Sequence, residues 1–381
     1  PREHKLTFGF LQESVKKEGA KEEVKEEEKS EEVVPKISEF ANTQNRVNAA
    51  DFFSNHPYHV RMEEFSRRVL APPQKAALRE TKWFYERARG QYADAQSELS
   101  QAGRKKFQAQ FPKSQMYTKT DLAKFENVWD EKPTFVNLGA QKNFAKYAER
   151  IGKEWEKTPL KFNEFYYKCS IARAIIFRRT EKLVSSQSWY QGGYRANIVA
   201  YTLAMLSEYC SENHKSLDLL WIWNKQYISL ATIHAIELIG KLVSDDISEP
   251  PHGISNISEW CKKEACWMRL QGKLDELEGL LPSEFISELI SKEKINEEVK
   301  DASKDQKIVN GIEAQTQVTR ISGTQWGSVL KVGKKKGIFT PKEMGILEVA
   351  SKIPGKIPSE KQSVILLNIL EKASLEGIVV S

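Results

Sequence analysis

The stretch FNEFYYKCSIARAIIFRRTEKLVSS, residues 162–186, predicts a long amphipathic helix with a basic end. Stretches of similar helical character follow it at 194–212, 216–243 and 258–281. Together they predict a multi-helix C-terminal bundle. We therefore expect a mainly α protein with a smaller α/β element at the N-terminal end.

Composition limits what such a chain can bind. Its 381 residues suffice for about two to three domains, and 40% of them are apolar, enough for real cores. The net charge of +6 is compatible with a polyanionic partner without requiring one. The four cysteines are scattered, unlike those of disulfide-rich secreted chains, so we infer reduced thiols in a cytoplasmic protein.

The most apolar region, 216–243, is interrupted near its middle by polar and charged residues such as Lys225 and Glu237. A membrane-spanning helix needs about 20 mostly apolar residues with few charges. This pattern favours helices buried inside a folded domain, and we expect no membrane partner. No signal peptide is visible, and the chain opens on Pro1 rather than Met, which indicates a fragment of a longer protein.

Changes in composition divide the chain into five segments. Residues 13–32 hold nine glutamates and five lysines, too few apolar groups to offset the entropy of ordering. The expected segments are a strand remnant and charged, partly disordered segment at 1–36, a basic α/β core region at 37–160, a helical bundle at 161–291, a linker at 292–322 and a small C-terminal helical module at 323–381.

In the terminal module, Thr340-Pro341-Lys342-Glu343 predicts a helix start with a capping box. The basic stretch 331–339 predicts a short hairpin or loop. A second helix, starting near Pro358, is expected to bury Val364, Leu367 and Leu370.

Positive charge is concentrated between Arg61 and Lys124. There, 14 lysines and arginines face seven acidic residues, a surplus of seven that exceeds the surplus of the whole chain. The stretch KWFYERARGQY, residues 82–92, lies inside this block and mixes aromatic rings with arginines. Such a stretch either buries charge with partners or presents rings and cations to a ligand.

Alternation along a strand would place Trp83, Tyr85, Arg87 and Arg89 on one face. That face is a platform on which bases stack and phosphates pair. A helix would instead set Trp83 against Arg87 and Tyr85 against Arg89 as cation–π pairs. The remaining alternative is that both arginines pair internally with Glu86 or another carboxylate and hold a core strand in place.

Polar residues on both sides of this stretch also have the chemistry to contact a nucleic acid. ANTQN, residues 41–45, carries three carboxamides, which suit either a self-satisfied turn or the reading of base edges. Helix entrances are expected at Thr118 or Thr120, with Asp121 in the first turn, and at Gly139, where free N–H groups could hold an anion or be capped. The candidate nucleic-acid-binding residues are Asn42, Gln44, Asn45, Arg61, Arg67, Trp83, Tyr85, Arg87, Arg89, Lys119, Lys124, Gln141 and Asn143.

Four blocks carry a resemblance to a known family: ISEFANTQNRVNAADFFSNHPYHVRMEEFSRR, KWFYERARGQY, TKTDLAKF and LGAQKNF. In order and spacing they resemble the signature blocks of the abortive-infection phage-resistance (AIPR) family, across about residues 37–144. The downstream helices and the tail after Trp326 resemble the C-terminal region of the family. The resemblance implies a bacterial phage-defence protein, often encoded beside restriction–modification genes.

Proteins of this family usually carry more chain upstream, including a segment around an Asn-Gly-x-Gln-Thr motif. That motif is absent from this sequence. The resemblance therefore implies that this chain is the C-terminal portion of such a protein.

Signs of catalysis are weak in the sequence. No Glu-x-Lys strand end of the restriction-nuclease type, nucleophile elbow or phosphate-binding glycine loop is present. Cys261 and Cys266 lack the second ligand pair that a zinc site needs, so we assign no metal ligand, no cofactor and no catalytic residue. We expect magnesium as a cofactor only if the missing upstream part is a nuclease.

Three functional hypotheses follow. The first is a nucleic-acid-binding and scaffolding region, with DNA or RNA as partner. The second is a nuclease or nucleotide-processing enzyme completed by the upstream segment, to which Glu86, Arg87 and Asp121 would contribute a polar site. The third is a protein–protein sensor of a phage component, and restriction–modification proteins are further potential partners.

Overall fold

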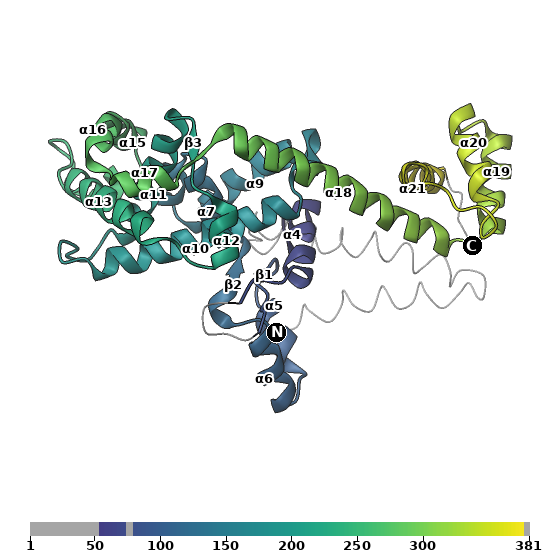
Figure 1. Cartoon of the computed structure of the whole chain (residues 1–381), viewed down its shortest axis with the longest axis horizontal. Coiled ribbons are helices and arrows are strands. Elements are labelled where there is room, and N and C mark those ends of the chain that lie inside the picture. The colour runs from purple at the N-terminus through teal and green to yellow at the C-terminus, as the bar shows by residue number, and fades with distance from the viewer. Residues whose placement is uncertain (1–52, 74–78, 377–381) are drawn as a thin grey trace, which may run out of the picture. The chain divides into compact units, whose positions relative to one another are not determined.

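The computed structural model describes residues 53–73 and 79–376, and helices make up most of them (Figure 1). The chain divides into two units, Pro1–His56 and Pro57–Ser381. Of the first unit, only residues 53–56 are described. They include the 3₁₀ helix η2 (Phe53–Asn55), beside which the rings of Phe53 and His56 stack with centroids 4.4 Å apart.

The second unit confirms a mainly α fold. Its described part contains two small sheets of two strands each. Strands β1 (Phe84–Glu86) and β2 (Met116–Thr118) pair in parallel, with Tyr85 opposite Tyr117. All three residues of β1 are buried, so this strand is covered on both faces rather than on one.

The β1–β2 pair belongs to the small α/β element near the N-terminal end of the described chain. An aromatic cluster of Phe84, Tyr92 and Phe111, with Phe107 and Met116 against it, packs the helices beside these strands. The helices and turns of this region are α4 (Pro57–Arg68), α5 (Gln91–Ser97), α6 (Gln101–Gln110) and the 3₁₀ helix η3 (Lys113–Gln115).

The stretch 162–186 forms α10 (Glu164–Ser186), the longest helix of the bundle core. Its N-cap is Asn163, whose side chain accepts a hydrogen bond from the Tyr166 backbone N–H at 3.0 Å. Helix α11 (Arg195–Glu212) lies against α10 and is buried all round from Ile198 to Leu206, as expected of a central helix.

Other helices surround α10 and α11. Helix α7 (Lys119–Trp129) packs on both of them as well as on α9, and α13 packs on α11 (Figure 1). These surrounding elements are α8 (Pro133–Asn137), α9 (Ala140–Lys157), η4 (Pro159–Lys161), α12 (Leu219–Lys225) and α13 (Leu230–Ile247).

The apolar region 216–243 is broken into α12 and α13, which meet at an angle of 117°. No single helix among residues 53–73 and 79–376 is long and apolar enough to cross a membrane, although this bent pair passes by length and composition. Short helices complete the bundle, and β3 (Lys215–Ser216) pairs antiparallel with β4 (Ile290–Ser291). The short helices are α14 (Ile257–Trp260), α15 (Glu264–Gln271), α16 (Leu274–Leu280) and α17 (Ser283–Glu288).

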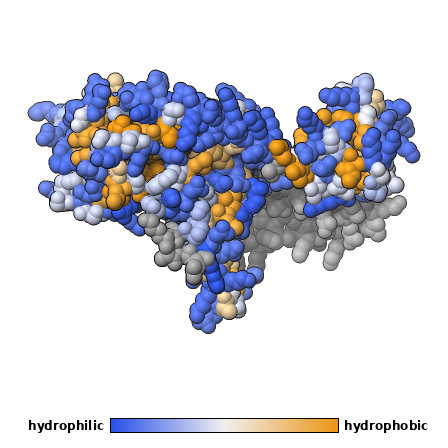
Figure 2. Space-filling view, in the orientation of Figure 1, coloured by the Kyte–Doolittle hydropathy of each residue, from blue (hydrophilic) through white to orange (hydrophobic). Residues whose placement is uncertain are grey.

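The segment expected to be a linker, 292–322, forms α18 (Lys292–Arg320), a helix of 29 residues. Its first turns contact α10, and its later part packs on α21. The polar sequence of this segment gave no clear apolar stripe, because most of the helix surface faces solvent and is largely hydrophilic (Figure 2).

The terminal module contains α19 (Gly323–Lys336), α20 (Pro341–Ala350) and α21 (Glu360–Leu375). Trp326 and Leu347 lie in its core, and the predicted capping box of Thr340 and Glu343 is present. The hairpin or loop predicted for 331–339 is wrong, because Lys331–Lys336 are the last turns of α19, ended by Gly337 at a positive φ of 68°.

Val364 was expected in the core of the module but is 41% exposed. Leu366 and Ile369 of the same helix are buried instead, while Leu367 and Leu370 are partly buried. The buried stripe of α21 is therefore rotated from the expected one, since its position depends on where α18 packs.

Candidate functional site

The aromatic side chains of 82–92 lie inside the protein. Trp83 is buried and its indole Nε1 donates a hydrogen bond to Gln226 Oε1 at 3.0 Å. Tyr85 is also buried, and its hydroxyl shares a hydrogen bond of 2.5 Å with His59 Nδ1. The aromatic face expected from strand alternation is therefore not presented to solvent here.

The two arginines of this stretch have different surroundings. Arg87 Nε donates to Glu63 Oε2 at 2.6 Å, and this carboxylate also accepts from Arg67 at 3.3 Å and from Gln91 at 3.0 Å. Arg89 is exposed, and the structure gives it no hydrogen bond or ion pair with the described residues. Arg87 thus has a structural partner, whereas Arg89 remains available to a ligand.

The acidic candidates cap helices. Glu86 accepts hydrogen bonds from the backbone N–H groups of Gly90 and Tyr92, at 3.1 and 3.2 Å. Asp121 forms a capping box with Thr118 and pairs with Lys124 at 3.4 Å. Both carboxylates are engaged at helix starts, and neither joins Arg87 in the described contacts.

The remaining candidates are divided between the interior and the surface. Arg61 lies 4.3 Å from the Trp155 ring and donates to the Pro159 carbonyl. Lys119 and Asn143 are buried, Asn143 accepting a hydrogen bond from Asn127, whereas Gln141 is exposed. Arg67 Cζ lies 3.6 Å from the centre of the Phe84 ring. Asn42, Gln44 and Asn45 lie outside the described residues.

A groove rich in basic residues lies next to the buried Trp83. It is lined by Lys113 from η3, by Arg178 and Lys182 from α10, and by Arg195 from α11, with Glu181 as its acidic residue. We call this set the basic groove; its volume is about 620 Å³. Positions 178 and 182 are one turn apart, so one stripe of α10 faces the groove.

Arg178 is the fixed cation of the basic groove. Its guanidinium donates to the carbonyl oxygens of Ser114 and Met116, at 2.6 and 2.5 Å, and lies 5.4 Å from the Trp83 ring centre. Burial lowers the pKa of Arg178, although Asp121 and Glu181 oppose this. Lys182 and Arg195 are exposed. The groove therefore combines one anchored guanidinium with cations that can reach a ligand.

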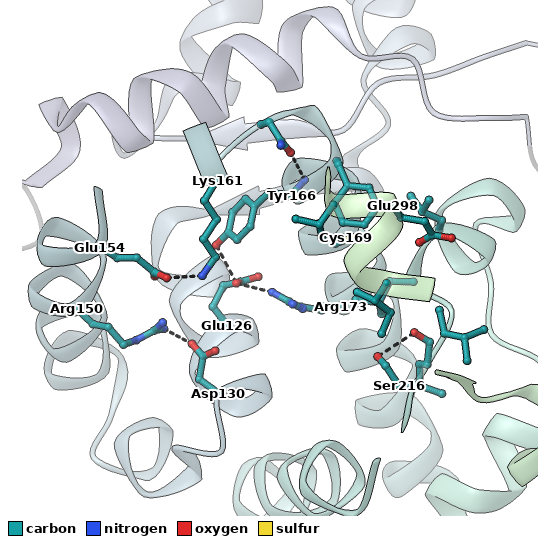
Figure 3. A pocket seen from close by; sticks show the side chains of 18 residues that line it. Glu126, Asp130, Arg150, Glu154, Lys161, Tyr166, Cys169, Arg173, Ser216 and Glu298 are labelled. Atoms are coloured by element: carbon teal, nitrogen blue, oxygen red, sulfur yellow. Dashed lines mark hydrogen bonds and ion pairs between the residues drawn. The ribbon is translucent and has the colours of Figure 1, made fainter. Parts of the chain in front are cut away.

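A second hollow, of about 230 Å³, lies among α7, α9, α10 and α18 (Figure 3). We call it the inner pocket. Two charged pairs on its wall are Glu126 with Arg173, at 2.6 Å, and Asp130 with Arg150. Its other wall is apolar, formed by leucines and isoleucines of α12, α18 and the β3–β4 region.

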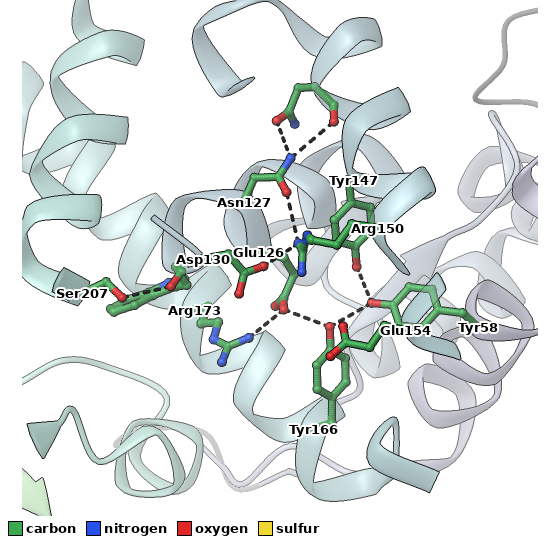
Figure 4. Close-up of polar contacts among 12 residues, drawn as sticks. Tyr58, Glu126, Asn127, Asp130, Tyr147, Arg150, Glu154, Tyr166, Arg173 and Ser207 are labelled. Atoms are coloured by element: carbon green, nitrogen blue, oxygen red, sulfur yellow. Dashed lines mark hydrogen bonds and ion pairs between the residues drawn. The ribbon is translucent and has the colours of Figure 1, made fainter. Parts of the chain in front are cut away.

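Tyrosines extend the charged wall into the interior (Figure 4). The Tyr166 hydroxyl donates to Glu126 Oε2 at 2.9 Å and lies 3.2 Å from the Tyr58 hydroxyl. Tyr58 in turn lies 2.5 Å from the hydroxyl of Tyr147. This chain of hydroxyls fixes the position of the Glu126 carboxylate.

Burial and charge act against each other in these pairs. Burial alone would lower the pKa of Arg173, but Glu126 and Tyr166 outweigh it, and the net pKa shift is upward. Burial raises the pKa of Asp130, although Arg150 opposes this. Arg173 therefore stays charged beside the buried Glu126 carboxylate.

Reasoning from the sequence missed the inner pocket. One available signal was that Glu126 and Asn127 lie between the apolar residues Phe125 and Val128, near the end of the helix predicted at 118–129. Arg173 lay unnoticed in the predicted amphipathic helix because its partner is 47 residues away. Among residues 53–73 and 79–376, no group of three or more His, Cys, Asp or Glu residues is placed to hold a metal ion.

A protein-family model described as AIPR protein matches residues 18–251, more than half of the chain. This range includes the basic groove and the charged wall of the inner pocket. No curated protein and no solved structure matches the chain.

Proposed function

Since the chain belongs to the AIPR family, with its role in abortive-infection phage resistance, we propose that it serves this role by binding nucleic acid through the basic groove. The observation that carries the proposal is the composition of the groove, in which four cations from three elements face one carboxylate. Cations matched to phosphates supply most of the affinity of non-specific nucleic-acid binding.

The geometry of Arg178 supports a phosphate-binding role for the groove. Because two backbone carbonyls and the Trp83 ring hold the guanidinium, little side-chain entropy is lost when it meets a phosphate. Trp83 then acts through Arg178 rather than by stacking on a base. Arg89 and Gln141 are exposed and stay candidates for additional contacts.

The proposal places this binding in the cytoplasm of a bacterial cell, with DNA or RNA as the partner. The four cysteines are free and buried, which fits a reducing compartment. Restriction–modification proteins or phage proteins would act as further partners of the same assembly.

The test is fluorescence anisotropy of the chain with labelled duplex DNA, single-stranded DNA and RNA. The test variant is Lys182→Gln/Arg195→Gln, because both side chains are exposed and their loss should leave the fold intact. The matched control is Lys146→Gln/Lys225→Gln, which removes the same charge from exposed sites that do not line the groove.

We expect the wild type and the control to bind at least one of the three nucleic acids, and the groove variant to bind about tenfold or more weakly. Preference among the three probes would identify the nucleic acid. Equal affinity of groove variant and control would contradict the proposal, as would the absence of binding by the folded wild type.

A further inference from the structure

The charges that line the inner pocket do not balance. Glu126 pairs with Arg173, Asp130 with Arg150 and Glu154 with Lys161. Glu298, on the first part of α18, also lines the pocket, and it has no ion pair within the described part of the chain. Of the four carboxylates that line the pocket, Glu298 is therefore the one for which no ion pair is found among the described residues (Figure 3).

The cation near Glu298 on the same helix is shared with another carboxylate. Lys294, one turn earlier on α18, pairs with Asp218 at 3.6 Å. Glu298 is partly buried, and burial followed by the negative charge of Asp218 raises the pKa of its carboxyl group, although the charge of Lys294 opposes this. A bound cation beside Glu298 would favour the charged carboxylate and so oppose both of the effects that raise its pKa.

Inside the pocket, the Glu126–Arg173 pair leaves one polar atom of each side chain without a hydrogen bond. Glu126 Oε1 and Arg173 Nε are buried and have no hydrogen-bond partner among the described residues. The Glu126 side chain is only 4% exposed. A buried polar atom without a partner has lost its hydrogen bond to water and gained none in return, so Glu126 Oε1 favours a bound donor.

The wall formed by α12 and α18, which also carries Glu298, suits a hydrocarbon stem. Its apolar residues, such as Leu217, Leu220, Ile295 and Val299, come from α12, α18 and the segment before α12. A ligand that is apolar along its length and positive at one end would match both these apolar residues and the Glu298 carboxylate. Anionic or purely polar ligands would leave Glu298 unpaired and the apolar wall uncovered.

We propose that the inner pocket binds an ammonium or guanidinium group carried on an apolar stem, with Glu298 as the carboxylate that receives the cation and Glu126 Oε1 as a further acceptor for a donor of the ligand or of a water molecule. A free alkylamine and a lysine or arginine side chain of a partner protein present the same chemistry. A carbonyl of the ligand or a water molecule would accept from Arg173 Nε. This proposal is independent of nucleic-acid binding in the basic groove.

The test is isothermal titration of the whole chain with pentylamine and butylguanidine, compared with pentanol and pentanoate, which share a short stem but lack a cation. We expect the two cations to bind with a Kd between about 10 µM and 1 mM, and the other two not to bind. A lysine whose α-amino and carboxyl groups are both blocked distinguishes a free alkylamine from a partner's side chain as the source of the cation. Tighter binding than pentylamine indicates a partner side chain, and weaker or equal binding indicates a free amine.

Two variants test whether the cations bind in the inner pocket. Glu298→Gln removes the unpaired charge while keeping the shape of the side chain, and we expect it to weaken cation binding by roughly tenfold or more. Glu297→Gln removes the same charge from an exposed neighbour and should leave binding unchanged. Binding of pentanoate as tight as that of pentylamine, failure of both cations to bind, or equal weakening by both variants would overturn the proposal.

Discussion

At the scale of single residues, Arg87 and Arg89 lie two positions apart but have different surroundings. Arg87 is 21% exposed and donates to Glu63, whereas Arg89 points to solvent. We predict that Arg87→Gln lowers the free energy of unfolding by about 1–2 kcal/mol, because a charge-assisted hydrogen bond is lost. Arg89→Gln should change it by less than about 0.5 kcal/mol. Urea denaturation measures both, and equal effects would contradict these assignments.

The Glu126–Arg173 pair allows a second prediction at this scale. Arg173→Gln leaves the buried Glu126 carboxylate without its cation, and we expect a loss of about 3 kcal/mol of stability. Arg179→Gln, on the same helix and exposed, is the control and should cost less than about 0.5 kcal/mol. A small loss in Arg173→Gln, comparable with the control, would mean that water or Tyr166 compensates the carboxylate.

Local residue roles were predictable where the partner is close in sequence. Thr118 and Asp121 were expected at a helix start and form a capping box there, three residues apart. The partners of Arg87 and Arg173 lie 24 and 47 residues away, and sequence spacing carries no information about such pairs. Trp83 and Tyr85 showed the alternation of a half-exposed strand, but the neighbouring helices bury both faces of β1.

At the scale of elements, two glycines in the terminal module differ in their surroundings. A Cβ at Gly333 of α19 would lie 2.0 Å from the Phe339 ring, whereas a Cβ at Gly345 of α20 would meet nothing within 4 Å. Gly333→Ala should therefore destabilise the protein by about 1–3 kcal/mol through overpacking. Gly345→Ala should stabilise it by up to about 1 kcal/mol, since alanine favours helix. Thermal unfolding distinguishes the two, and a stabilising Gly333→Ala would refute the packing of α19 on Phe339.

Helix capping in α20 predicts a pH dependence. The Thr340 backbone N–H donates to Glu343 at 2.6 Å and, with Lys372 nearby, keeps the pKa of this carboxyl below its usual value of 4.5. A carboxyl group whose pKa is lower in the folded state stabilises the protein at pH values above its unfolded-state pKa. This stabilisation is lost as the pH falls through the folded-state pKa. Glu343→Gln should thus be less stable than the wild type at pH 7, by about 0.3–1 kcal/mol, with the difference shrinking below about pH 4.5. Denaturant melts at pH 7 and pH 3 test this, with Glu348→Gln as control, and a constant difference would contradict it.

Helices were predictable from apolar periodicity, and the exceptions have physical causes. The amphipathic stretch 162–186 became α10 almost without change of boundary. The polar segment 292–322 became α18 although it offers little apolar surface, because packing occurs mainly at its two ends. The lysines of 331–336 continue α19 since helices tolerate a basic last turn, which favours the C-terminal end of the helix dipole.

At the scale of the whole molecule, the basic groove and the inner pocket are both assembled from segments that are distant in sequence. Lys113, Arg178 and Arg195 come from three elements, and Glu298 reaches the inner pocket from α18, far along the chain from Glu126. The sequence did show that positive charge gathers in the region of Arg61 to Lys124 and at the basic end of 162–186. It could not show which of these cations face one groove, because that depends on how α10 and α11 pack.

The central claim is that the basic groove binds nucleic acid, and the salt dependence of affinity tests it most directly. The measurement is the slope of log K against log salt for duplex DNA, for the wild type and for Lys182→Gln/Arg195→Gln. Each phosphate contact contributes about −0.9 to the slope, so the variant should lose up to about 2 of the wild-type slope. An unchanged slope together with unchanged affinity would contradict the account and leave the groove without a role in binding.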